Sequence, residues 1–187
     1  MALPTEYQLK VRLLEVTPAV WRRLLVRASV SLAKLHEILQ DIMGWENKHL
    51  YTFLVGDRAF EAPHPDASGG NARRTRLTSL RLAPGDRFHY LYDFGDDWNH
   101  ELTVEDAVGG LRAVDYAQCL DGANACPPED CGGAHGYSQV LEALERPDDP
   151  AFRELLEWLP PGFRPDVFDL RATNRILSVA HRHNRAV

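Results

Sequence analysis

The sequence predicts an α+β fold: a mostly antiparallel sheet with one early amphipathic helix and a helical C-terminal part. Two observations support this class. Strand-like alternation of apolar and polar residues dominates residues 7–105, with one helical pattern inside it, and helical patterns take over from residue 137. Runs of strands followed by runs of helices are typical of α+β proteins.

The first elements follow from periodicity and from chain breaks. Residues 7–13 alternate apolar and polar side chains, as a half-buried strand does, and residues 20–26 form the second arm of a hairpin after Pro18. Ser31 then caps a helix that Gly44 ends. The apolar residues of this helix fall on one face: Leu32, Leu35, Ile38, Leu39, Ile42 and Met43.

Further strands and three helices complete the expected order. The polar segment 56–76 contains prolines and glycines and is predicted to be a loop. Strands are predicted at residues 49–55, 87–92 and 98–105, the last two around a turn at 93–97. Helices are predicted at residues 137–144, 151–159 and 169–179.

Length, charge and hydropathy limit the class of protein. The chain fits a single domain, residues 1–187, with a strand-rich core at about 5–107 and a cysteine loop and helical part at about 111–182. Its net charge of −6 argues against a nucleic-acid partner, which normally meets a basic face. The first residues show no basic segment followed by an apolar one, so we expect no secretion signal, and no apolar run comes near the roughly 20 residues of a membrane span. We therefore expect a cytoplasmic protein with reduced thiols and no membrane partner.

The segment from Cys126 to Gly133 is the most informative stretch. Four residues separate Cys126 from Cys131, a spacing within the loose range of zinc knuckles, and Cys119 supplies a third thiolate. Two prolines hold the segment extended, and Gly132 and Gly133 let the backbone approach a sulfur closely. Three thiolates and one histidine would make a closed, structural zinc site.

The fourth zinc ligand is open among three histidines. His135 is closest in sequence, His49 precedes a strand, and His100 would tie the loop to the sheet. We favour the set Cys119, Cys126, Cys131 and His100. This set applies if a metal is bound; the interpretation that we prefer is a rigid loop with free, buried or half-buried thiols and no metal.

Carboxylates near these residues allow a second chemistry. Asp97, His100 and Glu129 could serve a metal-dependent hydrolase, with oxygen and imidazole ligands around a divalent ion. Glu129 and Asp130 are neighbours whose side chains diverge in an extended segment, so they are not expected to act on one atom. We expect them to accept backbone N–H groups or to pair with Arg22 or Arg23.

Several motifs occur in order over nearly the whole chain. They are Val20-Trp-Arg-Arg23, Gly44-Trp45 with His49-Leu-Tyr-Thr-Phe53, Tyr92-Asp-Phe-Gly-Asp-Asp-Trp-Asn-His100, Pro127-Pro-Glu-Asp130 with Gly132-Gly133, Gly136-Tyr137, and Phe168-Asp-Leu170 with Asn174. On these motifs the chain resembles the Ri-plasmid open-reading-frame-three-like family, whose members are often labelled transposon-passenger TnpR-like proteins. The resemblance implies a compact α+β domain and no established activity.

The sequence thus favours a binding or accessory module whose partner is an unidentified protein or small molecule. Zinc is its candidate cofactor, held at a structural site by the cysteine loop. The alternative function is the metal-dependent hydrolase built on Asp97, His100 and Glu129.

Overall fold

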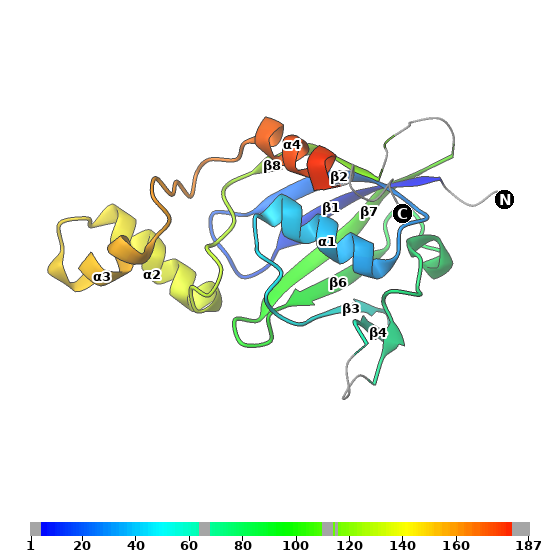
Figure 1. Cartoon of the computed structure of the whole chain (residues 1–187), viewed down its shortest axis with the longest axis horizontal. Helices are drawn as coiled ribbons and strands as arrows, with labels where there is room; N and C mark the ends of the chain where they lie inside the picture. Colours follow the sequence, from blue (N-terminus) through cyan, green and yellow to red (C-terminus); the bar gives the residue numbers. More distant parts are fainter. Residues whose placement is uncertain (1–4, 64–67, 110–113, 115, 181–187) are drawn as a thin grey trace.

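The computed structural model describes residues 5–63, 68–109, 114 and 116–180. It confirms the α+β class, with one eight-stranded sheet in the order β5-β4-β3-β6-β7-β1-β2-β8 (Figure 1). The strands are β1 (Glu6–Leu13), β2 (Trp21–Arg27), β3 (Tyr51–Val55), β4 (Arg58–Glu61), β5 (Gly70–Asn71), β6 (Arg87–Tyr92), β7 (Trp98–Val108) and β8 (Ala117–Ala123).

The sheet is mostly antiparallel because sequence neighbours pair as hairpins. β1 lies between β2 and β7 and runs antiparallel to both, and β6 pairs with β3 and β7 in the same sense. The short β4–β5 pair is parallel, so the sheet is mixed. The alternation predicted for β1 is observed: Tyr7, Leu9 and Val11 are buried, and the polar residues between them lie on the other face.

Helix α1 (Leu32–Met43) forms as its end signals predict. The Ser31 hydroxyl accepts a hydrogen bond from the Lys34 backbone N–H at 3.1 Å. Gly44 ends the helix in the left-handed conformation, with φ of 83°. The helix lies across one face of the sheet (Figure 1), and its apolar face is buried in the core. This packing places the segment after α1 beside the end of β6.

The C-terminal helices match the sequence prediction only in part. Helix α2 (Gly133–Glu145) begins four residues earlier than expected, and the segment predicted as one helix at 151–159 is a 3-10 turn, η2 (Pro150–Phe152), followed by α3 (Arg153–Trp158). Helix α4 (Leu170–Ala180) follows Asp169, whose side chain accepts the Ala172 N–H at 2.8 Å.

Helix α4 returns to the sheet, whereas α2 and α3 extend away from it (Figure 1). The Asn174 side chain fastens α4 to the edge strand β8. Its amide donates to the Cys119 carbonyl at 2.8 Å, and its oxygen accepts the Cys119 N–H at 2.9 Å. These two bonds use backbone groups that an edge strand would otherwise leave unpaired.

Three strands were missing from the sequence prediction. β4 and β5 lie within the segment 56–76 that was expected to be a loop, and β8 lies where periodicity fades. β5 has two residues and β4 has four, so neither is long enough to show a period of two. None of the helices within the described ranges is long and apolar enough to cross a membrane.

Candidate functional site

The cysteine loop, residues 126–133, lies against two other segments. One is the connection from α1 to β3, where the Trp45 indole N–H donates to the Pro127 carbonyl at 3.0 Å and the Glu46 N–H donates to Glu129 at 2.6 Å. The other is the β6–β7 turn, where the Asp96 carboxylate accepts the Gly132 N–H at 3.1 Å. The loop therefore joins the α1–β3 connection to the β6–β7 turn, two segments that are distant from each other and from the loop in the sequence.

The β6–β7 turn fixes the orientation of Asp93. Its backbone has φ of 57°, a left-handed conformation that aspartate tolerates because its side chain can bond its own backbone. One carboxylate oxygen, Oδ1, accepts the Gly95 N–H at 2.9 Å. The other oxygen, Oδ2, is left to point toward His49.

His49, Asp93 and Asp130 converge at this junction. The His49 Nε2 atom lies 2.9 Å from Asp130 Oδ1 and 3.5 Å from Asp93 Oδ2. The three ligand atoms lie within 4.8 Å of one another, and this is the one such group of three or more His, Cys, Asp or Glu side chains among the described residues. We call it the His49 cluster.

The geometry of the His49 cluster suits a divalent ion. Ligand atoms 2.0–2.2 Å from a tetrahedral zinc lie roughly 3.3–3.6 Å apart. The 3.5 Å between His49 and Asp93 falls in this range, whereas the 2.9 Å between His49 and Asp130 is a hydrogen-bond distance that would lengthen when an ion binds. The side chains of His49 and Asp130 are 31% and 54% exposed, so the cluster opens to solvent. Three protein ligands with an open side are typical of zinc sites that accept a further ligand.

Tyr92 is not a member of the His49 cluster, but it contacts the two segments that carry His49 and Asp130. Its buried hydroxyl donates to Glu129 Oε1 and accepts the backbone N–H groups of Lys48 at 3.0 Å and His49 at 3.4 Å. Burial and the neighbouring Glu129 raise the pKa of Tyr92 well above its usual value, so the hydroxyl stays a donor. One hydroxyl thus positions both the segment of His49 and that of Asp130.

The structure does not gather the residues predicted to bind zinc. No three of the donor atoms of Cys119, Cys126, Cys131 and His100 lie within 4.8 Å of one another. The thiols are free, and burial raises the pKa of Cys119 to about 11 and that of Cys131 to about 12. Burial also raises the pKa of Cys126, so all three are protonated at neutral pH. Zinc binding itself stays a prediction.

The two remaining histidine candidates lie elsewhere. His100 is fully buried, its Nδ1 lies 3.2 Å from the Tyr90 carbonyl and 3.1 Å from the Trp98 carbonyl, and burial lowers its pKa to about 4. Its Nε2 has no hydrogen-bond partner among the described residues. His135 is exposed on α2, beside Gln139. Of the three histidines considered from the sequence, His49 is the one that meets other ligand groups.

The structure does not support a hydrolase site built on the residues considered from the sequence, Asp97, His100 and Glu129. His100 is out of reach of any substrate, and Glu129 is already held by Tyr92 and the Glu46 N–H. Glu129 accepts a backbone N–H, that of Glu46, which lies outside the loop. Asp130 was expected to do the same or to pair with Arg22 or Arg23, and it pairs with His49. Arg22 donates to backbone carbonyls, and Arg23 pairs with Glu105.

Asp93 was missed as a ligand by sequence reasoning, which assigned it to a turn. In the structure Asp93 has both roles: one carboxylate oxygen bonds the turn backbone, and the other lies near His49. The one available signal was its position directly after a strand, next to an aspartate-rich turn.

The chain is thus an α+β protein with the His49 cluster beside its sheet. Comparison with known proteins shows the family to which it belongs. The family model described as "Plasmid pRiA4b ORF-3-like protein" matches residues 5–172. The chain belongs to this family. It is 42% identical over 154 residues to "Uncharacterized protein y4hQ" of Sinorhizobium fredii, which covers 81% of this chain and 79% of the relative.

The fold is also found in a solved structure. A protein of unknown function, MM3350 from Methanosarcina mazei Go1, superposes with a TM-score of 0.80 at 28% identity. The match covers 91% of this chain and 98% of that chain. These comparisons support the family resemblance inferred from the motifs and leave the TnpR-like label without support.

Proposed function

We propose that this protein is a binding module that holds a divalent metal ion, zinc foremost, at His49, Asp93 and Asp130. The observation that carries the proposal is the convergence of three ligand atoms within 4.8 Å from three separate segments. Zinc remains the proposed ion, as expected from the sequence, but we now propose the His49 cluster as its ligands in place of the cysteines. A reducing compartment, in which thiols stay unpaired, is the setting that we expect for this module.

The charge around the His49 cluster favours a cation. Asp96, Asp97 and Glu129 lie within the same turn and loop as the two aspartate ligands. Two of the three ligands are also positioned by a second contact, because Asp93 Oδ1 accepts the Gly95 N–H and the Tyr92 hydroxyl accepts the His49 backbone N–H. Such supporting contacts orient metal ligands and raise affinity.

Binding is favoured over hydrolysis at this ion. A hydrolase would need a free general base beside the metal-bound water. Glu129, the carboxylate next to Asp130 in the loop, already accepts bonds from the Tyr92 hydroxyl and the Glu46 N–H, one at each oxygen, which makes it a poor general base. The open side of the ion would instead receive a ligand.

The test is titration of the chelator-treated protein with Zn²⁺ or Mn²⁺ by calorimetry, together with thermal unfolding. Saturation at 100 times Kd should stabilise the fold by about 2.7 kcal/mol. Asp130→Asn keeps the size and the left-handed backbone of the residue but removes a ligand charge, so it should weaken binding at least about 100-fold. Asp97→Asn makes the same change on an exposed aspartate of the β6–β7 turn that is not a ligand, so it should weaken binding far less than Asp130→Asn.

Two outcomes would contradict the proposal. One is the absence of stoichiometric binding by either ion. The other is loss of zinc in Cys126→Ser with retention in Asp130→Asn, which would return the metal to the cysteine loop. Binding should also weaken in acid, because protons compete with the metal for imidazole and carboxylate ligands.

A further inference from the structure

A small hollow adjoins the His49 cluster. Its volume is about 240 Å³, below the roughly 300–1,000 Å³ of sites for drug-sized ligands. Apolar and polar side chains share its wall: Ala33, His36, Glu37, Asn47, His49, Leu50, Tyr51, Ala62 and Arg73. Because His49 belongs to both, a ligand in this hollow would lie next to an ion at the cluster.

The Tyr51 hydroxyl is an unused donor in the wall of this hollow. The residue is 7% exposed, and no hydrogen bond joins its hydroxyl to another described residue. The hydroxyl is not one of the fully buried polar atoms without a partner, so it keeps some exposed surface beside the hollow. The ring is held in place by stacking on His36, with centroids 3.7 Å apart. A ligand oxygen in the hollow would therefore meet a hydroxyl donor that the stacked ring already positions.

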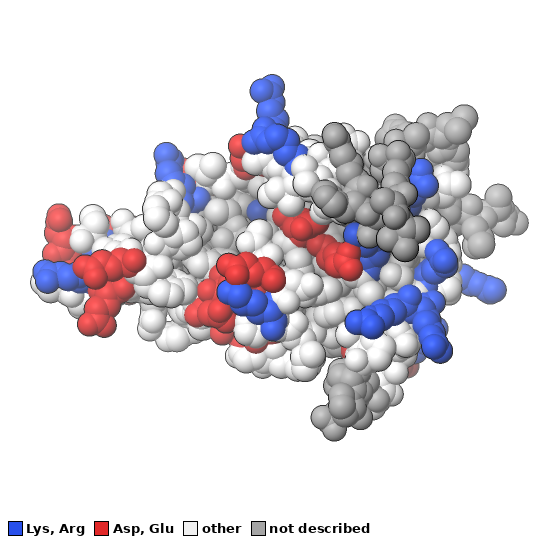
Figure 2. All heavy atoms as spheres, in the orientation of Figure 1, with Lys and Arg blue, Asp and Glu red and all other residues white. Residues whose placement is uncertain are grey.

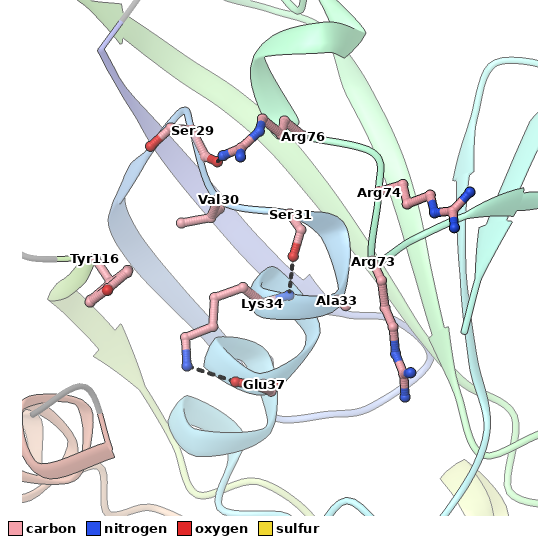
Figure 3. Close-up of a pocket in the computed structure, with 10 residues that line it drawn as sticks. All are labelled: Ser29, Val30, Ser31, Ala33, Lys34, Glu37, Arg73, Arg74, Arg76 and Tyr116. Atoms are coloured by element: carbon pink, nitrogen blue, oxygen red, sulfur yellow. Dashed lines mark hydrogen bonds and ion pairs between the residues drawn. The ribbon is translucent and has the colours of Figure 1, made fainter. Parts of the chain in front are cut away.

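Arg73 supplies a positive charge to the same wall. Within the described ranges its guanidinium has no ion pair, in contrast to Lys34, which pairs with Glu37 at 2.6 Å. Figure 3 shows Arg73 extending along α1, whereas Arg74 points away from the helix and Arg76 turns back to the Ser29 carbonyl. Of these three arginines, Arg73 is the one that also lines the smaller hollow.

A larger hollow at the start of α1 is a weaker candidate. It measures about 680 Å³, and basic side chains gather around this end of the molecule (Figure 2). However, the first N–H groups of α1 are already bonded: Leu32 to Thr75, Ala33 to Ala72, and Lys34 to Ser31. The helix terminus therefore offers no free backbone donor to an anion.

We propose that the smaller hollow binds a small molecule carrying a carboxylate or phosphate group, which Arg73 and Tyr51 recognise. Arginine pairs with either group through two parallel N–H bonds, and the tyrosine hydroxyl adds a third. The remaining end of the molecule faces His49 and completes the coordination of the ion. Only this last feature rests on the proposed metal site, because Arg73 and Tyr51 lie outside it.

The experiment measures binding of two probes, inorganic phosphate and succinate, to metal-free and zinc-loaded protein at constant ionic strength. NMR signals of the Tyr51 ring and the Arg73 Nε–H report occupancy. Arg73→Gln should weaken binding about 10- to 100-fold, as expected for loss of a charged hydrogen-bond partner. Arg74→Gln, the matched control, should leave it unchanged. Tyr51→Phe should weaken binding without lowering the melting temperature, because the lost hydroxyl has no protein partner.

The outcomes separate this inference from the metal proposal. Binding of a probe to metal-free protein that depends on Arg73 supports the inference even if no zinc binds. Zinc binding with no response to either probe overturns the inference and leaves the metal site standing. Equal losses in Arg73→Gln and Arg74→Gln would also overturn it, since they would indicate general charge attraction. Preference between phosphate and succinate identifies the anionic group.

Discussion

Removing the hydroxyl of Tyr92, in the variant Tyr92→Phe, should destabilise the protein, whereas Tyr137→Phe should not. Both tyrosines are at most 1% exposed, so Tyr→Phe removes the same atom from a buried ring. The Tyr92 hydroxyl donates to Glu129 and accepts the Lys48 N–H. The Tyr137 hydroxyl has no partner among the described residues.

The expected magnitudes follow from these partners. A hydrogen bond to a charged group contributes about 1.5–3 kcal/mol, and Tyr92→Phe should cost that amount. For a protein of this size, about 2–4 °C of melting temperature are lost for each kcal/mol. Tyr137→Phe removes a buried group without a partner, so stability should stay equal or rise.

Urea unfolding of the two variants and the wild type, followed by circular dichroism, checks this prediction. The midpoint should fall only in Tyr92→Phe, with an unchanged slope, because the surface exposed on unfolding is the same. Zinc affinity should fall as well, since Tyr92 positions the backbone of His49. Equal midpoints for Tyr92→Phe and Tyr137→Phe would refute the assignment of Tyr92 as the anchor of the junction.

Two further predictions concern pH and backbone contact. Burial lowers the pKa of His36 and His100 to about 4, so the unfolded chain binds more protons below pH 6.5 and stability falls as pH drops from 6.5 to about 4. In His36→Gln the slope of unfolding free energy against pH should be smaller by up to about 1.4 kcal/mol per pH unit, and an unchanged slope would contradict the assignment. Gly133→Ala should destabilise the fold more than Gly162→Ala, as thermal unfolding would show. Both glycines have positive φ, but a Cβ on Gly133 would lie 2.5 Å from the Asp96 carbonyl oxygen, whereas the space at Gly162 is open; equal losses would contradict this reasoning.

The parts of the fold that the sequence predicted well are those that local chemistry determines. The helix after Ser31 and the strands at either side of the 93–97 turn have strong periodicity and clear end signals, and their observed bounds match closely. β8 has no such pattern, because its glycine and its exposed aspartate interrupt the alternation. That strand depends on pairing with β2 and on Asn174, and both partners are distant in sequence.

The candidate site could be predicted only in its components. From the sequence, His49 was one of three possible zinc ligands and Asp130 was a loop residue expected to accept hydrogen bonds. Nothing in the local sequence indicated that these two residues, 81 positions apart, would be in contact.

The glycines of the cysteine loop show where the sequence argument stopped. A glycine at position 133 does permit a close backbone approach, as its residue type implies, but the neighbour is the Asp96 carbonyl and not a sulfur. That contact presses the loop onto the β6–β7 turn, the turn that carries Asp93, and brings Asp130 to His49. The rigid loop therefore assembles a site from carboxylates while its own cysteines remain free. Residue types predicted the close approach, but the sheet order, which places β6 between β3 and β7, decides which group Gly133 approaches.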